Sequence, residues 1–145
     1  SYDPDKNETV VGTYEGTEVH LADYKRELIV VHAWASWCTY CAEELSVLAR
    51  LKDMYGDEVH ILAVNRAEPA ETARAFTDRL QLGREIEILL DPTDSFYREI
   101  GGYAMPETIF INKRGEIIFH QRGPMRLEEV VARIDTLVGK ATGHE

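Results

Sequence analysis

The chain contains two nearly continuous apolar runs, at residues 27–34 (ELIVVHAW) and 58–65 (EVHILAVN). Runs of this kind are typical of strands that are covered on both faces, as in the middle of a sheet. A shorter run at residues 85–90 (EIEILL) has the same character. We therefore expect two buried strands and a third, shorter one.

From Cys38 onward the period of the apolar positions changes to that of a helix. The recurring positions are Cys41, Leu45, Leu48, Leu51 and Tyr55, and Gly56 ends the pattern. Three later segments are also expected to be helices: residues 69–82, 95–101 and 126–140. Pro69 near the start and Gly83 after the end mark the limits of the first of these three.

Two stretches place apolar residues around a turn signal, and each predicts a β-hairpin. They are residues 9–24, which turn at Glu15-Gly16, and residues 107–123, which turn at Lys113-Arg114-Gly115. Strands that alternate with helices and are followed by an antiparallel hairpin and a helix indicate an α/β sandwich. We expect a mixed central β-sheet, helices on both of its faces and an N-terminal β-hairpin.

Length and composition fit a single globular domain, since the chain has 145 residues of which 44% are hydrophobic. We place this domain at residues 9–139, after a flexible lead-in at 1–8 and before a frayed tail at 140–145. The start is polar, with no signal-peptide pattern and no initiator Met. We therefore expect a processed or trimmed chain, which leaves an upstream signal or anchor open.

The charge balance is 16 basic against 26 acidic residues, a net charge of −10. This balance argues against nucleic acid as a partner, because such binding depends on Lys and Arg on phosphates. It also disfavours anionic membrane surfaces. No stretch approaches the roughly 18 consecutive apolar residues of a membrane span.

Cys38 and Cys41 are the only cysteines, and they lie where the first apolar run gives way to the first helix. In a helix, residues i and i+3 share a face with Cβ atoms about 5–6 Å apart. The pair can therefore open and close as a disulfide with only a modest adjustment. Because a helix N-terminus favours a thiolate, we expect Cys38 to be the exposed nucleophile and Cys41 the buried thiol that resolves a mixed disulfide.

Two other interpretations of the cysteine pair fit the sequence less well. A structural zinc site needs four ligands, usually with a second Cys or His pair at similar spacing. The histidines form no such pair, because they are scattered along the chain at His20, His32, His60, His120 and His144. A disulfide that closes so short a loop removes little entropy from the unfolded chain and makes a poor crosslink. A redox pair without a metal is the better interpretation.

Three motifs, in the right order, resemble those of a known family. WASWCTYC (34–41) looks like the active-site motif of thioredoxin-like proteins. EGTEVHLADYK (15–25) followed by LIVVHAWASWC (28–38) resembles the N-terminal hairpin and first core strand of the TlpA/ResA/DsbE group. GGYAMPETIFINKRGEIIFHQRGPM (101–125) resembles the group's cis-proline segment, most closely that of the cytochrome c maturation reductases. The resemblance spans Val10 to Val138.

The resemblance implies a thioredoxin-like sandwich and an extracytoplasmic protein-disulfide reductase whose redox group is the Cys38–Cys41 disulfide, with no other cofactor. The implied partners are a disulfide-containing protein substrate, such as apocytochrome c, and a membrane thiol donor that recharges the pair. Family members are commonly held by an N-terminal anchor, which would lie outside this chain. Nothing in the sequence demands more than a monomer.

The resemblance also assigns residues that would contact the substrate. Pro106 matches the cis-proline, which would lie against the cysteines, and the backbone of Met105 would pair with a bound peptide strand. Trp37 would shield the cysteine pair and contact the partner, with plain packing as the alternative. Tyr40, between the two cysteines, departs from the residues usual in the family, and by its size it would screen substrates sterically.

Three polar residues close to these motifs carry two interpretations each. Glu44 matches an acidic residue of the family and would accept the proton of Cys41, or it is a solvated helix glutamate. His32 stands where relatives carry Asp or Asn, and it is either a proton shuttle or, as we favour, a neutral core histidine with one hydrogen bond. Glu107 would help to form an acidic mouth for a basic partner, or it occupies a strand end.

Three functions are compatible with these residues. The leading hypothesis is a disulfide reductase. A disulfide oxidase or isomerase would use the same cysteines at a more oxidising potential. A thioredoxin-like binding module would use the groove at Met105 and Pro106 without turnover.

Overall fold

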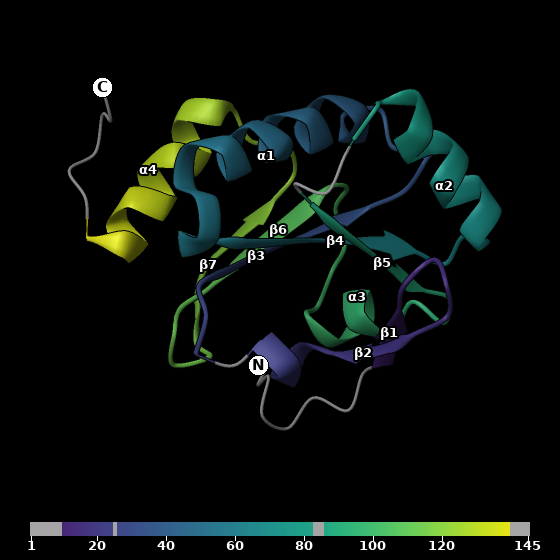
Figure 1. Cartoon of the computed structure of the whole chain (residues 1–145), viewed down its shortest axis with the longest axis horizontal. Coiled ribbons are helices and arrows are strands. Elements are labelled where there is room, and N and C mark those ends of the chain that lie inside the picture. The colour runs from purple at the N-terminus through teal and green to yellow at the C-terminus, as the bar shows by residue number, and fades with distance from the viewer. Residues whose placement is uncertain (1–9, 25, 83–85, 140–145) are drawn as a thin grey trace.

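A mixed sheet of seven strands runs through the centre of the structure, a computed structural model that describes residues 10–24, 26–82 and 86–139 (Figure 1). The strands are β1 (Val10–Gly12), β2 (Glu18–His20), β3 (Ile29–Trp34), β4 (His60–Arg66), β5 (Glu87–Asp91), β6 (Glu107–Ile111) and β7 (Ile117–Arg122). Their order is β2-β1-β5-β4-β3-β6-β7. β4 pairs in parallel with β3 and β5, and the other pairs are antiparallel, so the expected mixed sheet and both hairpins are present.

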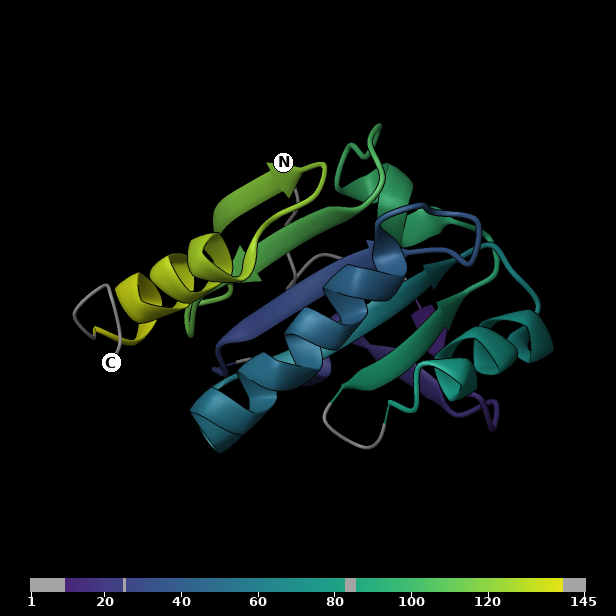
Figure 2. The same ribbon diagram turned by 90° about the horizontal axis from the view of Figure 1, so that it is seen from above.

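The helices are α1 (Cys41–Tyr55), α2 (Ala70–Arg79), α3 (Ser95–Glu99) and α4 (Leu127–Val138), with short 3₁₀ helices η1 (Leu21–Tyr24) and η2 (Gly56–Glu58). α1, α2 and α4 cover one face of the sheet, and α3 lies on the other (Figures 1 and 2). The expected arrangement, with helices on both faces, is therefore confirmed. The expected lead-in at 1–8, the tail at 140–145 and Gly83 lie outside the described residues.

The first helix starts later than its periodicity predicted. α1 begins at Cys41 rather than at Cys38. Residues 38–40 form a tighter turn ahead of it, in which the N–H of Cys41 donates to the C=O of Cys38 at 3.3 Å. The difference arises because a 3₁₀-type turn at a helix N-terminus continues nearly the same apolar spacing as the helix that follows.

Alternating side chains of β3 divide the core between the two faces of the sheet. Val30 and Trp34 belong to the hydrophobic cluster under α1, α2 and α4. Ile29 and Val31 belong to a second cluster, with residues of α3 and η1. Every residue of β3 is buried, which is why its sequence shows a continuous apolar run rather than an alternation.

Four segments that are distant in the sequence meet at one end of the central strands. β3 and β4 both end there, and antiparallel β6 begins there, since Ala33 pairs with Glu107. β7 ends there as well, because Glu107 pairs with Arg122. The loops at 35–40, 67–69, 101–106 and 123–126 therefore converge around the first turn of α1 (Figure 2). The carboxyl ends of parallel strands are a common place for a functional site.

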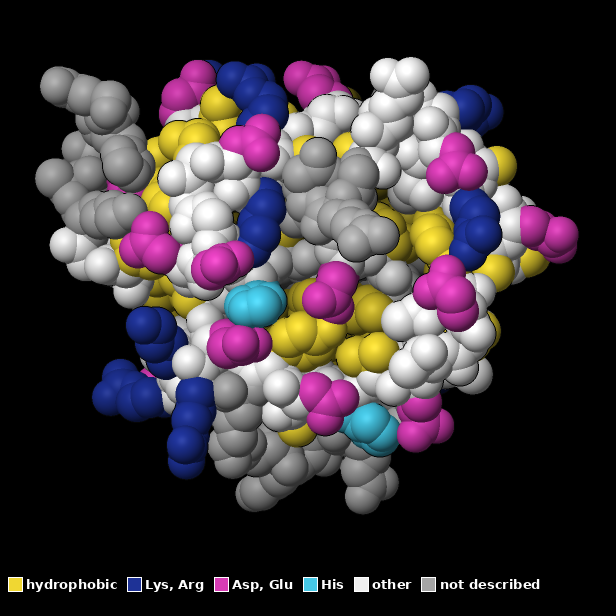
Figure 3. Space-filling view, in the orientation of Figure 1, with side chains coloured by type: hydrophobic (Ala, Val, Ile, Leu, Met, Phe, Trp, Pro, Cys, Tyr) yellow, Lys and Arg dark blue, Asp and Glu magenta, His cyan; other side chains and the backbone are white. Residues whose placement is uncertain are grey.

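The surface carries charges of both signs. Figure 3 shows acidic and basic side chains interspersed over one face, with hydrophobic side chains exposed between them. Among the helices of the described residues, none has the length and apolar character needed to cross a membrane.

Candidate active site

Cys38 and Cys41 form a disulfide, with their Cα atoms 5.4 Å apart. Cys41 is 0% exposed and Cys38 is 7% exposed, and both belong to the cluster under α1. The burial of Cys41 agrees with the sequence. The expectation that Cys38 is exposed is wrong for this oxidised state, because the bond to buried Cys41 holds its sulfur within the cluster. Cys38 is nevertheless the more accessible of the two.

The chain ahead of the cysteines is held by Glu68, which the sequence did not single out. The Glu68 carboxylate accepts hydrogen bonds from the Ser36 N–H at 2.8 Å, from the Ser36 hydroxyl at 2.5 Å and from the Asn65 side-chain amide at 2.8 Å. Burial tends to raise the pKa of Glu68, but these hydrogen bonds outweigh it and lower that pKa. Glu68 follows Ser36 by 32 residues, so no local spacing could have indicated the contact.

Exposed aromatic side chains frame the disulfide. Trp37 is 62% exposed and Tyr40 is 52% exposed, so neither is simply packed in the core. The Arg66 guanidinium lies 5.9 Å from the centre of the Trp37 ring and 3.4 Å from that of Tyr97. The same guanidinium donates two hydrogen bonds, of 3.0 and 2.7 Å, to the Asp94 carboxylate. These bonds hold Arg66 against the Trp37 and Tyr97 rings. Arg66 is a further residue of the site that sequence reasoning missed.

The segment ahead of β6 contains a cis peptide bond between Met105 and Pro106. Tyr97 explains the glycine at 102, since a Cβ there would lie 2.6 Å from the Tyr97 ring. The Tyr97 hydroxyl donates to the C=O of Ala104 at 2.6 Å and holds the segment in place. Among the described residues, the N–H and C=O of Met105 have no hydrogen-bond partner. The Met105 backbone therefore keeps an unpaired donor and an unpaired acceptor within this part of the structure.

Glu107, the first residue of β6, is 0% exposed. One carboxylate oxygen accepts the N–H groups of Tyr103 at 2.5 Å and Ala104 at 2.8 Å, and the other lies 2.6 Å from Nε2 of His120. The prediction of an acidic mouth at Glu107 is therefore wrong, because its carboxylate is turned inward. The alternative, a residue at the strand end, matches the structure.

His32 lies under α1, where the sequence placed it, and is 0% exposed. Its Nδ1 is 2.9 Å from the hydroxyl of Thr108 in β6, and its Nε2 has no hydrogen-bond partner among the described residues. Burial lowers the pKa of His32 to about 4. The imidazole is therefore neutral at pH 7 and makes one hydrogen bond, as the favoured interpretation predicted.

Glu44 occupies the wall between α1 and the start of α4 and is 7% exposed, so it is not a solvated glutamate. One carboxylate oxygen accepts the Met125 N–H at 2.9 Å, and the other lies 3.8 Å from His32 Nδ1. Burial raises the pKa of Glu44 to about 7, opposed by the Met125 hydrogen bond and supported by the charges of Glu43 and Glu129. Glu44 is thus poised to gain or lose a proton near neutral pH.

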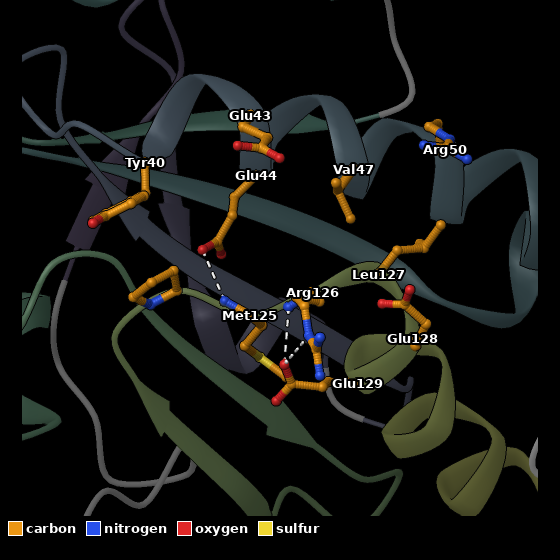
Figure 4. Close-up of a pocket in the computed structure, with 11 residues that line it drawn as sticks. Tyr40, Glu43, Glu44, Val47, Arg50, Met125, Arg126, Leu127, Glu128 and Glu129 are labelled. Carbon is orange, nitrogen blue, oxygen red and sulfur yellow. Dashed lines mark hydrogen bonds and ion pairs between the residues drawn. The ribbon is translucent and has the colours of Figure 1, made fainter.

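A groove of about 650 Å³ connects Glu44 to the surface. It is lined by residues of α1, of the segment that leads into α4 and of the first turn of α4, with Tyr40 at one end and Arg50 at the other (Figure 4). Figure 4 shows the Glu44 side chain reaching from α1 toward Met125 across this groove. Water in the groove can therefore exchange protons with Glu44. Within the described residues, no group of three or more His, Cys, Asp or Glu side chains is arranged to hold a metal ion.

The fold and the cysteine pair together define a thioredoxin-like thiol-disulfide oxidoreductase. The Redoxin family model matches residues 6–138, and the chain belongs to that family. Within it, the chain fits the TlpA/ResA/DsbE group that its motifs indicated.

Individual relatives agree with this assignment. Thiol-disulfide oxidoreductase ResA of Geobacillus thermodenitrificans is 29% identical over 129 residues, which cover 88% of this chain and 73% of that protein. Thiol:disulfide interchange protein HelX of Rhodobacter capsulatus is 30% identical over 84% of this chain and 66% of its own length. A secreted Mycobacterium tuberculosis disulfide oxidoreductase homologous to E. coli DsbE has the same fold, with a TM-score of 0.78 and 18% identity over 88% of this chain and 95% of its own.

Proposed function

We propose that this oxidoreductase works as a reductase, in which the reduced Cys38–Cys41 pair delivers two electrons to a disulfide of a partner protein. The observation that carries the proposal is the charge around the pair. His32 is neutral and Glu44 is neutral or negative, so neither side chain adds a positive charge to the partial charge of the α1 N-terminus, which favours a thiolate. A pair whose reduced form is not specially stabilised has a low potential, about −270 mV in thioredoxin against about −120 mV in DsbA.

The reaction proceeds by two exchanges. The Cys38 thiolate attacks one sulfur of the partner's disulfide, forms a mixed disulfide and releases the other sulfur as a thiolate, which takes up a proton. Cys41 then loses its proton to the Glu44 carboxylate and attacks the Cys38 sulfur, and the partner's remaining sulfur leaves as a thiolate that takes up a proton from water. The partner leaves with two thiols, and the chain is left with the Cys38–Cys41 disulfide. A thiol donor must then reduce this disulfide again.

The reduction potential tests the direction of electron flow. We would equilibrate the chain with glutathione and dithiothreitol buffers and measure the fraction of the disulfide. A value near about −270 mV or below supports the reductase. A value near about −120 mV would assign the chain to the oxidases instead.

The partner would dock as an added strand on Met105, whose N–H and C=O have no hydrogen-bond partner within the described part of the chain, and Pro106 would lie against the cysteines. Trp37 and Tyr40 offer exposed aromatic surface on either side of Cys38, for contact and steric selection. A Cys41→Ser variant should trap the mixed disulfide with Cys38, and peptide mapping of the trapped complex would locate the docked strand. Crosslinks to Met105 from a photoreactive residue beside the substrate cysteine would support this placement.

A binding module without turnover is the alternative from another class. The double variant Cys38→Ser, Cys41→Ser separates it from an enzyme. If the variant folds but loses disulfide exchange and partner function, the enzyme is supported. Full retention of partner function would instead support the binding module.

The substrate class and the location follow from the resemblance. We propose an exported protein with a Cys-x-x-Cys-His segment, such as apocytochrome c, as the substrate. An extracytoplasmic, monomeric chain recharged by a membrane thiol donor fits this role, and the extracytoplasmic location agrees with the secreted M. tuberculosis protein of the same fold. Faster reduction of an oxidised Cys-x-x-Cys-His peptide than of a scrambled one would test the substrate. Cell fractionation of the full-length protein would test the location. Analytical ultracentrifugation of this chain would test the oligomeric state, since a monomer has a mass of 16.5 kDa.

A further inference from the structure

A buried carboxylate supports the segment that carries Met105. Removing a charge from water costs several kcal/mol unless it is paired and hydrogen-bonded. Glu107 meets this requirement through the N–H groups of Tyr103 and Ala104 and through Nε2 of His120, at distances of 2.5, 2.8 and 2.6 Å. Since two of these three donors belong to the segment itself, the charge holds the segment to the sheet.

These bonds decide which backbone groups face a partner. The N–H groups of Tyr103 and Ala104 are turned inward to Glu107. On the other side, the C=O of Pro106 accepts the N–H of Gly123 at 2.8 Å. The backbone is thus fixed on both sides of Met105, whose own N–H and C=O are free among the described residues. A strand that docks on Met105 meets groups that are already oriented, so little entropy is lost on binding.

His120 orients Glu107 from the neighbouring strand. It lies in β7, opposite Ile109 of β6, and its side chain is 17% exposed. Arg122 of the same strand is a more distant partner, with its Nε 3.8 Å from the carboxylate and its Nη2 donating to the C=O of Gly101 at 3.2 Å. Of these two side chains of β7, His120 is therefore the one within hydrogen-bond distance of the Glu107 carboxylate, and it holds the oxygen that the Tyr103 and Ala104 N–H groups do not bind.

We propose that His120 is a positioning residue for protein substrates. Through Glu107 it fixes residues 103–106 in the arrangement that a docking strand requires. This inference rests on the proposed docking at Met105. It implies that His120 matters for disulfides in proteins, which dock on Met105, and not for small disulfides, which reach Cys38 without docking.

Three variants of the full chain test the proposal. His120→Leu removes the donor at similar volume, and His120→Gln keeps an N–H donor. His60→Leu is the matched control, because His60 is also half-buried and its Nε2 lies 3.1 Å from a glutamate, Glu27. His60 is the first residue of β4, at the end of the strands away from the cysteines. The probes are insulin and bis(2-hydroxyethyl) disulfide, with dithiothreitol as the electron source.

We expect His120→Leu to lose about tenfold in kcat/KM for insulin, mainly through KM, as for a charge-assisted hydrogen bond that is lost. Its rate with the small disulfide should stay within about twofold of wild type, because no docking is involved. His120→Gln should recover most of the insulin activity, and His60→Leu should match wild type with both probes. Amide hydrogen exchange at Tyr103 and Ala104 should be faster in His120→Leu than in wild type, and it should be unchanged in His120→Gln and His60→Leu.

An equal loss with both probes, or no loss with insulin, would overturn the positioning role. Unchanged amide exchange at Tyr103 and Ala104 would overturn it as well. If His120→Leu does not fold, His120→Asn, whose side chain is too short to reach Glu107, is judged by the same criteria. A wild-type chain that reduces neither probe would refute the proposed function, whereas an active wild type with an equally active His120→Leu would refute this inference only.

Discussion

Replacing Glu44 by glutamine removes the ionisation of a carboxyl group that the fold buries. Folding raises its pKa from 4.5 to about 7. At about 1.4 kcal/mol per pKa unit, this change corresponds to roughly 3.4 kcal/mol. Since the groove keeps the carboxyl in contact with water, we expect somewhat less than half of this, about 1.5 kcal/mol. Glutamine keeps an oxygen for the Met125 N–H, so the hydrogen bond at 2.9 Å can persist.

The sign of the effect follows from the direction of the pKa change. Because the pKa of Glu44 is raised in the folded chain, its contribution to stability is fully present below about pH 4.5 and is lost as the pH rises through about 7. Glutamine does not ionise, so the variant has no such loss. The free energy of unfolding of Glu44→Gln, relative to wild type, should therefore rise by about 1.5 kcal/mol between pH 4.5 and pH 8.

Urea unfolding of the oxidised chains, followed by tryptophan fluorescence at several pH values, measures this difference. Glu43→Gln is the matched control, because Glu43 is the exposed neighbour of Glu44 in the first turn of α1. We expect its stability relative to wild type to change little over the same range. A Glu44→Gln difference that stays constant with pH, or that falls, would refute the argument from burial. In the reduced chain, Glu44→Gln should also slow resolution of the mixed disulfide by about 100-fold if Glu44 accepts the Cys41 proton.

Three further substitutions have defined outcomes. Since burial already keeps His32 neutral above about pH 5.5, His32→Asn should leave the pH profile of thiol–disulfide exchange unchanged between about pH 6 and 9, and a shifted profile would support a proton shuttle instead. Gly102→Ala puts a Cβ 2.6 Å from the Tyr97 ring, so we expect a stability loss of about 1–3 kcal/mol and weaker activity on insulin than on a small disulfide. Trp34→Ala empties a fully buried site that stacks on Phe76 at 5.3 Å, and urea unfolding should show a loss of about 3–5 kcal/mol.

Features that depend on short-range patterns could be predicted from the sequence. The buried strand that ends at Trp34 and the helix that contains Cys41 are marked by a change of period over a few residues. The cis bond before Pro106 was expected from the resemblance and is present in the structure. The exposure of Cys38 was not predicted correctly, because Cys38 is bonded to the buried Cys41 in the oxidised chain and its place in the helical pattern does not show this.

Contacts between loops could not be predicted, because they depend on how the strand ends converge. Glu68 binds Ser36 across 32 residues, and nothing in the sequence around either residue signals the other. Glu107 illustrates the same limit. Its place after the proline suggested an acidic surface, but the register that sets Ile109 opposite His120 supplies a buried partner for its carboxylate. The orientation of a charged side chain at a strand end is decided by the neighbouring strand.

Because Cys41 is fully buried in the fold, the reduction potential of the Cys38–Cys41 pair is linked to the conformational stability of the chain. Oxidation and folding form a closed thermodynamic cycle. The potential of the folded pair therefore differs from that of the same cysteines in the unfolded chain by the difference in unfolding free energy between the two oxidation states. For a two-electron couple, about 30 mV corresponds to about 1.4 kcal/mol. A strongly reducing pair must accordingly stabilise the fold when oxidised, so the electron-carrying form is the less stable one. How reducing the chain can become is then limited by how much stability its dithiol form can lose and still remain folded.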